Sequence, residues 1–310
     1  MNDTPMKQVF VTGATGFVGQ HFRTLIEATP GWRMLPAPLD FDLRDSGVIA
    51  RVIAALPGPL DAVLHLAAQS NVPQAFADPE ATFDINFFGT LRLLRSLKNA
   101  GFRGRFLFVG TADAYGLVPD DELPVCEMRA LKPRNPYAVS KTAAEALVYQ
   151  WSQTENLDAL IARPFNHIGP GQDERFAVAA FARQIVGISR GKRDARIEVG
   201  DIDITRDFTD VRDVVRAYLA LIAHGECGRV YNIGSGNEIR LGEILNRLIR
   251  LAGIRAEICT DPQRLRSAEQ RRMCADTRCI RATVGWQPHY SLDQTLIDTL
   301  NYWKGKLTNE

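Results

Sequence analysis

The chain has 310 residues and a formal net charge of only +1, because it contains 37 Lys and Arg residues and 36 Asp and Glu residues. With 45% apolar and 24% charged residues, the composition is ordinary for a globular protein and excludes a disordered chain. The near-zero charge argues against binding nucleic acid by bulk charge. Thirty of the basic residues are Arg. We expect most of them to be solvated and a few to grip phosphates through the bidentate guanidinium.

The cysteines and the hydropathy of the chain point to a reducing compartment. The chain has five cysteines, an odd number without close pairs, which argues against a disulfide framework. No His and Cys set accompanies Cys274 and Cys279 at metal-binding spacing. No signal peptide precedes the first predicted strand, and no run approaches the roughly 18 apolar residues of a membrane span. We therefore expect a cytoplasmic protein without a metal or a membrane contact.

Strand-like and helix-like segments alternate along the first half of the chain. Short apolar runs predict strands, and apolar residues at helical spacing predict helices. The predicted strands cover 8–12, 32–37, 62–67, 106–109 and 159–162, and the predicted helices cover 17–28, 46–56, 79–99 and 136–155. This alternation with short connections predicts an α/β fold, a doubly wound parallel sheet of the Rossmann-like kind.

The pattern changes after residue 163, where a loop rich in Pro and Gly begins. A predicted helix at 211–223 and a predicted strand at 230–233 continue the helix and strand alternation of the first half of the chain. We expect residues 1–165 and about 207–235 to form a dinucleotide-binding domain. Residues from about 166 to 206 and from 236 to 305 should form a smaller, mixed α/β C-terminal domain that binds the substrate.

A G-x-x-G-x-x-G motif, Gly13, Gly16 and Gly19, lies between the first predicted strand and the first predicted helix. The first glycine permits a tight turn, a later one lets the backbone approach a pyrophosphate, and the last lets the helix pack closely on the strand. The free N–H groups at the helix start would then face the phosphates. The motif predicts a dinucleotide-binding loop.

The end of the second strand bears on the choice of cofactor. An acid that grips the adenosine ribose is usual there, but this chain has Ala37 and Pro38. Because no carboxylate would repel a 2′-phosphate, both NADP and NAD stay open. Arg33 and Arg44 are candidate phosphate partners, although a simple surface position is the better expectation for both.

Tyr137 and Lys141 are four residues apart at the start of a predicted helix, so their polar groups can share one face. A nearby ammonium should lower the pKa of the phenol, and the Lys can also bond the nicotinamide ribose. Thr111 follows the predicted strand 106–109, at the edge where doubly wound sheets bind ligands. We predict that Tyr137, Lys141 and Thr111 are catalytic.

Together these features resemble the extended short-chain dehydrogenase/reductase family over essentially the whole chain. Further family-like landmarks are Asp42-Leu43, His65 to Ala68, Asn86, Gly89-Thr90, Tyr115-Gly116, Asn135-Pro136 and Glu145. The resemblance implies contacts with the cofactor from Gly13, Thr15, Gly16, Phe17, Val18, Asp42, Leu43, Leu66, Ala67, Ala68, Tyr137, Lys141 and Pro164.

The resemblance also implies a homodimer through the two long helices at about 79–99 and 136–155. The first offers Phe83, Phe87, Leu91 and Leu94 at helical spacing, although these residues could equally belong to the core. Asn86 would be structural and support the helix that carries Tyr137.

Within that family, the C-terminal half is most similar to the GDP-6-deoxy-4-keto-D-mannose reductases, which form GDP-D-rhamnose. The similar stretches are 163–172, 200–211 and 266–269, although Ser267 replaces the usual Pro. The resemblance implies that Asn166, Arg206 and Arg266 contact the substrate diphosphate and that Glu269 contacts the nucleotide ribose. Phe176, Val178 and Arg183 are further candidates for the nucleotide pocket.

The expected reaction is reduction of a 4-keto nucleotide sugar by reduced NADP or NAD. A 4,6-dehydratase and a 4-epimerase of the same fold are the alternatives, with a non-catalytic dinucleotide sensor more remote. In the related dehydratases, Ser or Asp and then Glu follow the Thr, whereas Ala112 and Asp113 stand here. Asp113 is therefore a catalytic candidate as a base, or a carboxylate that orients the loop. The sequence leaves the rhamno and talo epimers open.

Overall fold

The computed structural model describes residues 6–264 and 270–308. Its centre is a parallel sheet of six strands in the order β2-β1-β3-β4-β5-β9. These strands are β1 (Lys7–Thr12), β2 (Trp32–Pro36), β3 (Ala62–His65), β4 (Arg105–Val109), β5 (Asp158–Pro164) and β9 (Val230–Ile233). The order reverses direction between β1 and β3, the kind of position where open α/β sheets bind ligands.

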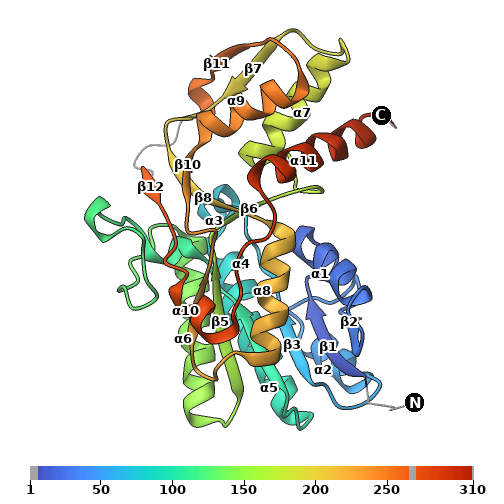
Figure 1. Cartoon of the computed structure of the whole chain (residues 1–310). Coiled ribbons are helices and arrows are strands. Elements are labelled where there is room, and N and C mark those ends of the chain that lie inside the picture. The colour runs from blue at the N-terminus through green and yellow to red at the C-terminus, as the bar shows by residue number, and fades with distance from the viewer. Residues whose placement is uncertain (1–5, 265–269, 309–310) are drawn as a thin grey trace.

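Helices cover both faces of this sheet (Figure 1), which confirms the predicted doubly wound fold. One face is packed by α1 (Phe17–Glu27), α8 (Val211–His224) and α10 (Arg278–Val284). The other is packed by α2 (Ser46–Ala54), α5 (Gly89–Asn99) and α6 (Pro136–Thr154). Side chains alternate along each strand, so Val9 and Val11 enter the first core while Phe10 enters the second.

The segment predicted as one helix over 79–99 is interrupted, and the prediction is wrong in this respect. It consists of α4 (Pro79–Phe83), a π-helical turn η1 (Asp84–Phe88) and α5, with α3 (Val72–Ala77) before it. The N–H of Gly89 donates to the carbonyl of Asp84, five residues back. Single π turns of this kind often occur at functional sites, and this one carries Asn86.

The remaining strands form two smaller sheets. One contains β10 (Glu238–Arg240), β8 (Thr205–Asp210) and β12 (Arg272–Met273), with β6 (Asn166–Ile168) paired to β8. The other pairs β7 (Arg196–Val199) with β11 (Glu257–Thr260). With α7 (Ala177–Ser189), α9 (Leu241–Ala252) and α11 (Leu292–Lys306), they build a separate hydrophobic core. The exact domain boundaries drawn from the sequence stay a prediction.

Three short 3₁₀ turns complete the described elements: η2 (Ala112–Tyr115), η3 (Asp120–Glu122) and η4 (Pro262–Arg264).

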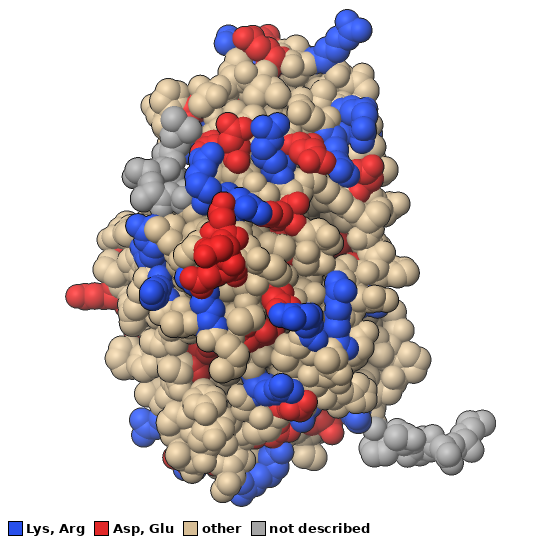
Figure 2. Space-filling model, turned by 60° about the vertical axis from the view of Figure 1, so that its left-hand side comes forward, with Lys and Arg blue, Asp and Glu red and all other residues tan. Residues whose placement is uncertain are grey.

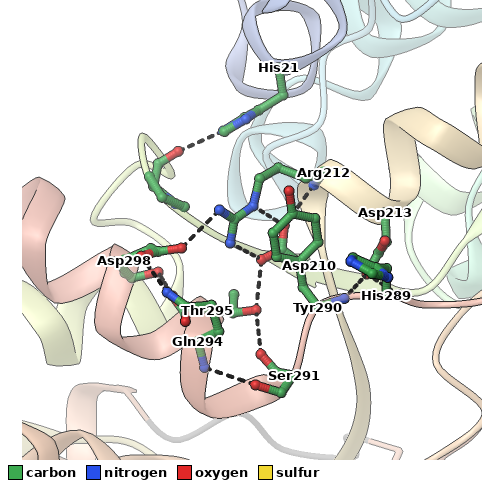
Figure 3. A network of polar contacts seen from close by, with 12 residues as sticks. His21, Asp210, Arg212, Asp213, His289, Tyr290, Ser291, Gln294, Thr295 and Asp298 are labelled. Atoms are coloured by element: carbon green, nitrogen blue, oxygen red, sulfur yellow. Dashed lines mark hydrogen bonds and ion pairs between the residues drawn. The ribbon is translucent and has the colours of Figure 1, made fainter. Parts of the chain in front are cut away.

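A polar network joins the two cores at the start of α8 (Figure 3). Arg212 pairs with Asp210 at 2.7 Å and with Asp298 of α11 at 2.8 Å, and its guanidinium lies 3.8 Å from the ring centroid of Tyr290. The hydroxyl of Thr295, also on α11, donates to Asp210 at 2.7 Å. Helix α11 is thus tied to the helix that covers the large sheet.

Basic and acidic side chains are interspersed over the face in Figure 2, and no large field of one sign appears there. Several Arg are engaged in ion pairs, such as Arg264 with Glu198 at 3.1 Å and Arg240 with Asp203 at 3.0 Å. This arrangement matches the prediction that most Arg are solvated.

Over the described residues, no helix is both long and apolar enough to cross a membrane. The same part of the chain contains no cluster of three or more His, Cys, Asp or Glu residues that could hold a metal ion. All five cysteines are free thiols.

Candidate active site

The glycine loop lies at the carboxyl end of β1, where it adjoins the chain that leaves β3. Gly13 has a φ of +69°, and a Cβ there would lie 2.8 Å from the backbone nitrogen of Ala67. A Cβ on Gly19 would lie 2.5 Å from the Gly13 carbonyl oxygen. Gly16 caps α1 without a side-chain hydrogen bond, and no acid stands in the first turn. The loop can therefore present backbone N–H groups to an anion.

A buried histidine holds the ends of β1 and β3 together. The hydroxyl of Thr90 donates to the Asn86 carbonyl at 2.7 Å, so it accepts from His65 Nε2 at 3.1 Å. His65 Nδ1 then accepts from the Thr12 hydroxyl at 2.7 Å, and Thr12 accepts from the backbone N–H of Ala67 at 3.1 Å. Burial, with help from the Lys141 charge, lowers the pKa of His65 to about 3, so the ring is neutral.

The predicted adenine contacts lie in the loop after β2. Asp42 accepts from the backbone N–H of Arg44 at 2.9 Å and from its guanidinium at 2.7 Å. This pairing lowers the pKa of Asp42. Leu43 is buried against Gly89. A side chain on Gly89 would clash with the Leu43 Cβ, 2.7 Å from the position of its own Cβ. Arg33 is exposed on the edge strand β2.

Thr111 and Tyr137 meet at the carboxyl edge of the sheet, as predicted. Thr111 caps η2, where its hydroxyl accepts from the backbone N–H of Asp113 at 3.2 Å, and it also hydrogen-bonds the Tyr137 side chain. The pKa of Tyr137 is raised above its ordinary value by burial and by the nearby Asp113 charge. This direction is opposite to the one expected from the Tyr–Lys spacing, because desolvation outweighs any nearby cation.

Lys141 is buried one helical turn beyond Tyr137, with 3% of its surface exposed. Its ammonium lies 4.3 Å from the ring centroid of Phe108. Burial lowers the pKa of Lys141 to about 7, and the Glu145 carboxylate opposes part of that shift.

Two asparagines fix the helix that carries Tyr137 and Lys141. The side chain of Asn135 caps α6 by accepting from the N–H of Ala138 at 2.7 Å, and Pro136 begins the helix. Asn86 of the π turn donates to the Ser140 hydroxyl at 2.9 Å and also bonds the backbone of Gln69 in both directions. These contacts agree with the expectation that Asn86 supports the helix that carries Tyr137.

Two predicted substrate contacts lie on paired strands. In the β6–β8 pair, Asn166 stands opposite Phe208, two residues beyond Arg206. Asp207, which the sequence analysis did not single out, is fully buried. It accepts from the backbone N–H groups of Ser235, Gly236 and Ala275 at 2.7, 2.9 and 3.1 Å. These bonds hold β8, and with it Arg206, against the loop after β9.

The loop after β6 packs on the first turn of α1. The rings of Phe17 and His167 are stacked with centroids 6.1 Å apart, and His21 Nε2 bonds the Pro170 carbonyl oxygen at 2.8 Å. His167 Nδ1 bonds the Phe165 carbonyl oxygen at 3.0 Å. The predicted cofactor contact Phe17 therefore also joins α1 to this loop.

The remaining candidates are more dispersed. Phe176 is half exposed, Val178 is buried in the smaller core, and Arg183 is ion-paired with Glu174. Arg266 and Glu269 lie outside the described residues. Thr15 is exposed in the glycine loop, while Val18 and Leu66 pack beside the first core. Ala67 packs beside the second core, Ala68 follows it, and Pro164 ends β5.

Beneath Thr111, Tyr137 and Lys141 lies a buried polar cluster, Glu145, Arg163, Tyr115 and Asn232, whose mutual contacts the sequence did not predict. The Glu145–Arg163 ion pair is almost fully buried, and Arg163 donates to the Tyr115 hydroxyl at 2.9 Å. Glu145 and Tyr115 are landmarks of the family resemblance, but the sequence predicts no partner for either. Arg163 lies on β5, whereas Glu145 is on α6 and Tyr115 is on η2, so no local sequence pattern predicts that they meet.

Comparisons with known proteins agree with this geometry. The family model described as GDP-mannose 4,6 dehydratase matches residues 38–299. The chain is 46% identical over 306 residues to GDP-6-deoxy-D-mannose reductase of Pseudomonas aeruginosa, which covers 98% of this chain and 99% of the relative. It is 28% identical to GDP-mannose 4,6-dehydratase of Vibrio cholerae, over 82% of this chain and 74% of that enzyme.

Solved structures give the same result. RMD from Pseudomonas aeruginosa, complexed with NADPH, superposes with a TM-score of 0.91 at 45% identity, covering 96% of this chain and 99% of that one. UDP-glucose 4-epimerase of Thermus thermophilus, complexed with NAD, superposes with a TM-score of 0.84 at 27% identity, over 96% and 99% of the two chains.

Proposed function

Since the chain belongs to the GDP-mannose 4,6 dehydratase family, within the extended short-chain dehydrogenases/reductases, we propose that it reduces GDP-4-keto-6-deoxy-D-mannose to GDP-D-rhamnose. The observation that carries this proposal is the full-length, 46% identity to a GDP-6-deoxy-D-mannose reductase. The chain retains the Thr111, Tyr137 and Lys141 set that such a reduction needs, which also disfavours a sensor without catalysis.

The glycine loop fits a dinucleotide cofactor, because Gly13 and Gly19 allow β1, α1 and Ala67 to pack closely, where a side chain would clash, and the start of α1 has no side-chain cap. When bound, a reduced nicotinamide supplies the hydride for carbon 4 of the keto sugar. Gly13, Thr15, Gly16, Phe17 and Val18 would hold the pyrophosphate side. Asp42, Leu43, Leu66, Ala67, Ala68 and Pro164 would line the rest of the cofactor site. NADPH is the reduced cofactor in the similar RMD structure.

Tyr137 is the proton donor in this proposal. Its raised pKa keeps the phenol protonated at neutral pH, which suits an acid that must protonate the alkoxide formed at the sugar oxygen. Thr111, hydrogen-bonded to Tyr137, is placed to donate to the same oxygen. Lys141 would bond the nicotinamide ribose, and its positive charge would stabilise the phenolate left after proton transfer.

The substrate diphosphate would lie beside the paired strands β6 and β8. Asn166 and Arg206 are the described residues that we propose for it, and Arg266 would add a second guanidinium. Glu269 would accept from the nucleotide ribose, and Phe176, Val178 and Arg183 would border the base. Guanidinium groups suit this task, because each can bond two phosphate oxygens at once.

The dehydratase alternative requires a base that takes a proton from carbon 5 of the sugar. Ala112 has no such group, and Asp113 is one methylene shorter than the Glu of the related dehydratases. We propose that Asp113 orients the η2 loop and influences Tyr137 electrostatically rather than acting as that base.

The deciding experiment supplies GDP-4-keto-6-deoxymannose with NADPH or NADH, follows absorbance at the reduced nicotinamide, and identifies the product by NMR. Reduction to the rhamno epimer supports the proposal, whereas the talo epimer would correct its stereochemistry. Conversion of GDP-mannose to the keto sugar without net cofactor consumption would instead identify a dehydratase.

We also propose a cytoplasmic homodimer. The stripe expected to mediate it faces inward, since Leu94 is buried and Phe87 and Leu91 pack beside the core. Other apolar side chains are exposed on the same helices: Phe88 on η1, with Val139 and Tyr149 on α6. Light scattering should give twice the chain mass, and Val139→Glu with Tyr149→Glu should give a monomer. A monomeric wild type would overturn the proposed dimer.

The free thiols suit the reducing compartment that the proposed cytoplasmic location implies.

A further inference from the structure

Thr111 and Lys141 reach the reaction site from separate elements, the η2 turn after β4 and helix α6. Each is followed, four residues later, by a buried polar side chain, Tyr115 after Thr111 and Glu145 after Lys141. These two side chains converge on one guanidinium, that of Arg163 on β5, which is 4% exposed.

The fork geometry of Arg163 allows both contacts at once. Its Nε donates to Glu145 Oε2 at 3.1 Å, and its Nη2 pairs with the other carboxylate oxygen. Its Nη1 donates to the Tyr115 hydroxyl at 2.9 Å and to the Glu127 carbonyl oxygen at 3.1 Å. A Lys at this position would be a point charge without this planar geometry.

The backbone next to Thr111 is also packed against this pair. Gly110 precedes Thr111 directly, and a Cβ on it would lie 3.2 Å from Glu145 Oε2 and 3.6 Å from Arg163 Cγ. Tyr115 in turn donates to Asn232 Oδ1 of β9 at 2.7 Å. The η2 turn is therefore held on both sides, at Gly110 just before it and at Tyr115, its last residue.

Stability alone is a weak reason for such an arrangement. Two charges taken out of water lose hydration, and replacing a buried ion pair by apolar side chains of similar volume is often neutral or stabilising. Removing only one partner is costly, because the other charge is left buried without compensation.

We propose that Arg163, with Glu145 and Tyr115, is a positioning residue that sets the separation of the Thr111 hydroxyl and the Lys141 ammonium. The inference rests on the proposed reductase function. Because these three side chains are buried, we assign them no direct contact with substrate or cofactor. It acts by holding the η2 turn and α6 in the relative position that the reaction requires, and small displacements of catalytic groups cost large factors in rate.

The test compares wild type, Arg163→Met and the double variant Glu145→Met with Arg163→Met. We expect Arg163→Met to lower the urea midpoint strongly and the double variant to recover most of that loss. The kcat of the double variant should nevertheless stay at least tenfold below wild type, while the KM for the keto sugar changes less than threefold. A double variant that recovers both stability and kcat to within twofold of wild type would show a merely structural pair.

Two further variants keep the test decisive. Arg105→Met is the matched control, because Arg105 pairs with Asp158 at 3.0 Å at the opposite, amino end of the same strands. It should lower stability and leave kcat within twofold. If the double variant fails to fold, Tyr115→Phe decides: it removes one hydroxyl and should lower kcat at least threefold with little change in KM. An unchanged kcat there would overturn the proposal.

Crystal structures of wild type and the double variant separate this inference from the proposed function. The distance between Thr111 Oγ1 and Lys141 Nζ should differ by more than about 1 Å between them. An unchanged distance overturns the positioning inference whatever the substrate. Absence of keto-sugar reduction by wild type, with the distance altered as expected, overturns the proposed function alone.

Discussion

At the proposed catalytic centre, burial moves the pKa of Tyr137 upward and the pKa of Lys141 downward, to about 7. In each case the cause is the cost of holding a charge away from water. The phenol therefore stays protonated while the ammonium is close to losing its proton. A Tyr in this condition suits the part of proton donor that we propose for it in ketone reduction.

Replacing Tyr137 with Phe should remove the donor and keep the ring. We expect turnover to fall by at least about 10²-fold, the usual contribution of a placed general acid. Binding of NADPH, measured by fluorescence titration, should change less than threefold. A variant that retains most of the wild-type turnover would show that another group supplies the proton.

Ala37, directly after β2, is the residue that bears on the choice between cofactors. Ala37→Asp would place a carboxylate where the adenosine 2′-phosphate of NADPH is expected, so it should lower kcat/KM for NADPH at least tenfold by repulsion. The value for NADH should change less than threefold.

The matched control for this change is Ala37→Asn, because the Asn side chain has nearly the same size as Asp but no charge. It should affect both cofactors equally. Equal losses with the Asp variant would mean that the 2′-phosphate lies elsewhere, and Arg33 and Arg44 would then be the next residues to change.

Among the elements, the π turn η1 and its neighbours connect the two halves of the site. Thr90, at the start of α5, donates to the Asn86 carbonyl of this turn and starts the bond series that runs through His65 to Thr12 at the end of β1. Asn86 extends from the same turn to Ser140 on α6. The π turn and the start of α5 therefore connect the end of β1 with helix α6.

His65 makes this connection sensitive to pH. Its folded pKa of about 3 lies below the ordinary value of 6.5, so the unfolded chain takes up the proton first as pH falls. The stabilisation is complete above about pH 6.5 and decreases toward pH 3, by up to about 1.4 kcal/mol per pH unit.

Urea unfolding of wild type and His65→Asn at pH 7 and pH 4.5 measures this contribution. Wild type should lose about 2–3 kcal/mol more than the variant over that interval. Equal losses in the two proteins would indicate that folding does not lower the pKa of His65.

For the whole molecule, the contact between the two cores depends on Arg212 (Figure 3). Its partner Asp210 is fully buried at its side chain, and its other partner, Asp298, is on α11. Arg212→Leu would leave Asp210 with the Thr295 hydroxyl and the backbone as its remaining donors. We expect the free energy of unfolding to fall by about 2–3 kcal/mol.

The control for that change is Arg229→Leu, which removes an exposed pair with Glu226. Exposed pairs contribute little, so the loss should stay below about 1 kcal/mol. Similar losses in the two variants, measured by urea unfolding, would contradict the part assigned to Arg212.

The parts of this protein that the sequence determined are those that near neighbours encode. The alternation of strands and helices, the Gly13–Gly19 loop and the Tyr137–Lys141 helix face follow from spacings of two to seven residues, and local geometry alone gives such spacings their meaning. Thr111 was found because parallel strands end at a shared edge.

The tertiary structure alone decided what depends on distant partners. The four bonds that hold Asp207 and the meeting of Tyr115, Glu145 and Arg163 join residues far apart in sequence. The upward pKa of Tyr137 belongs here too, since it arises from burial. Desolvation and pairing of polar groups depend on everything that surrounds them in space, and a linear pattern contains only the neighbours along the chain.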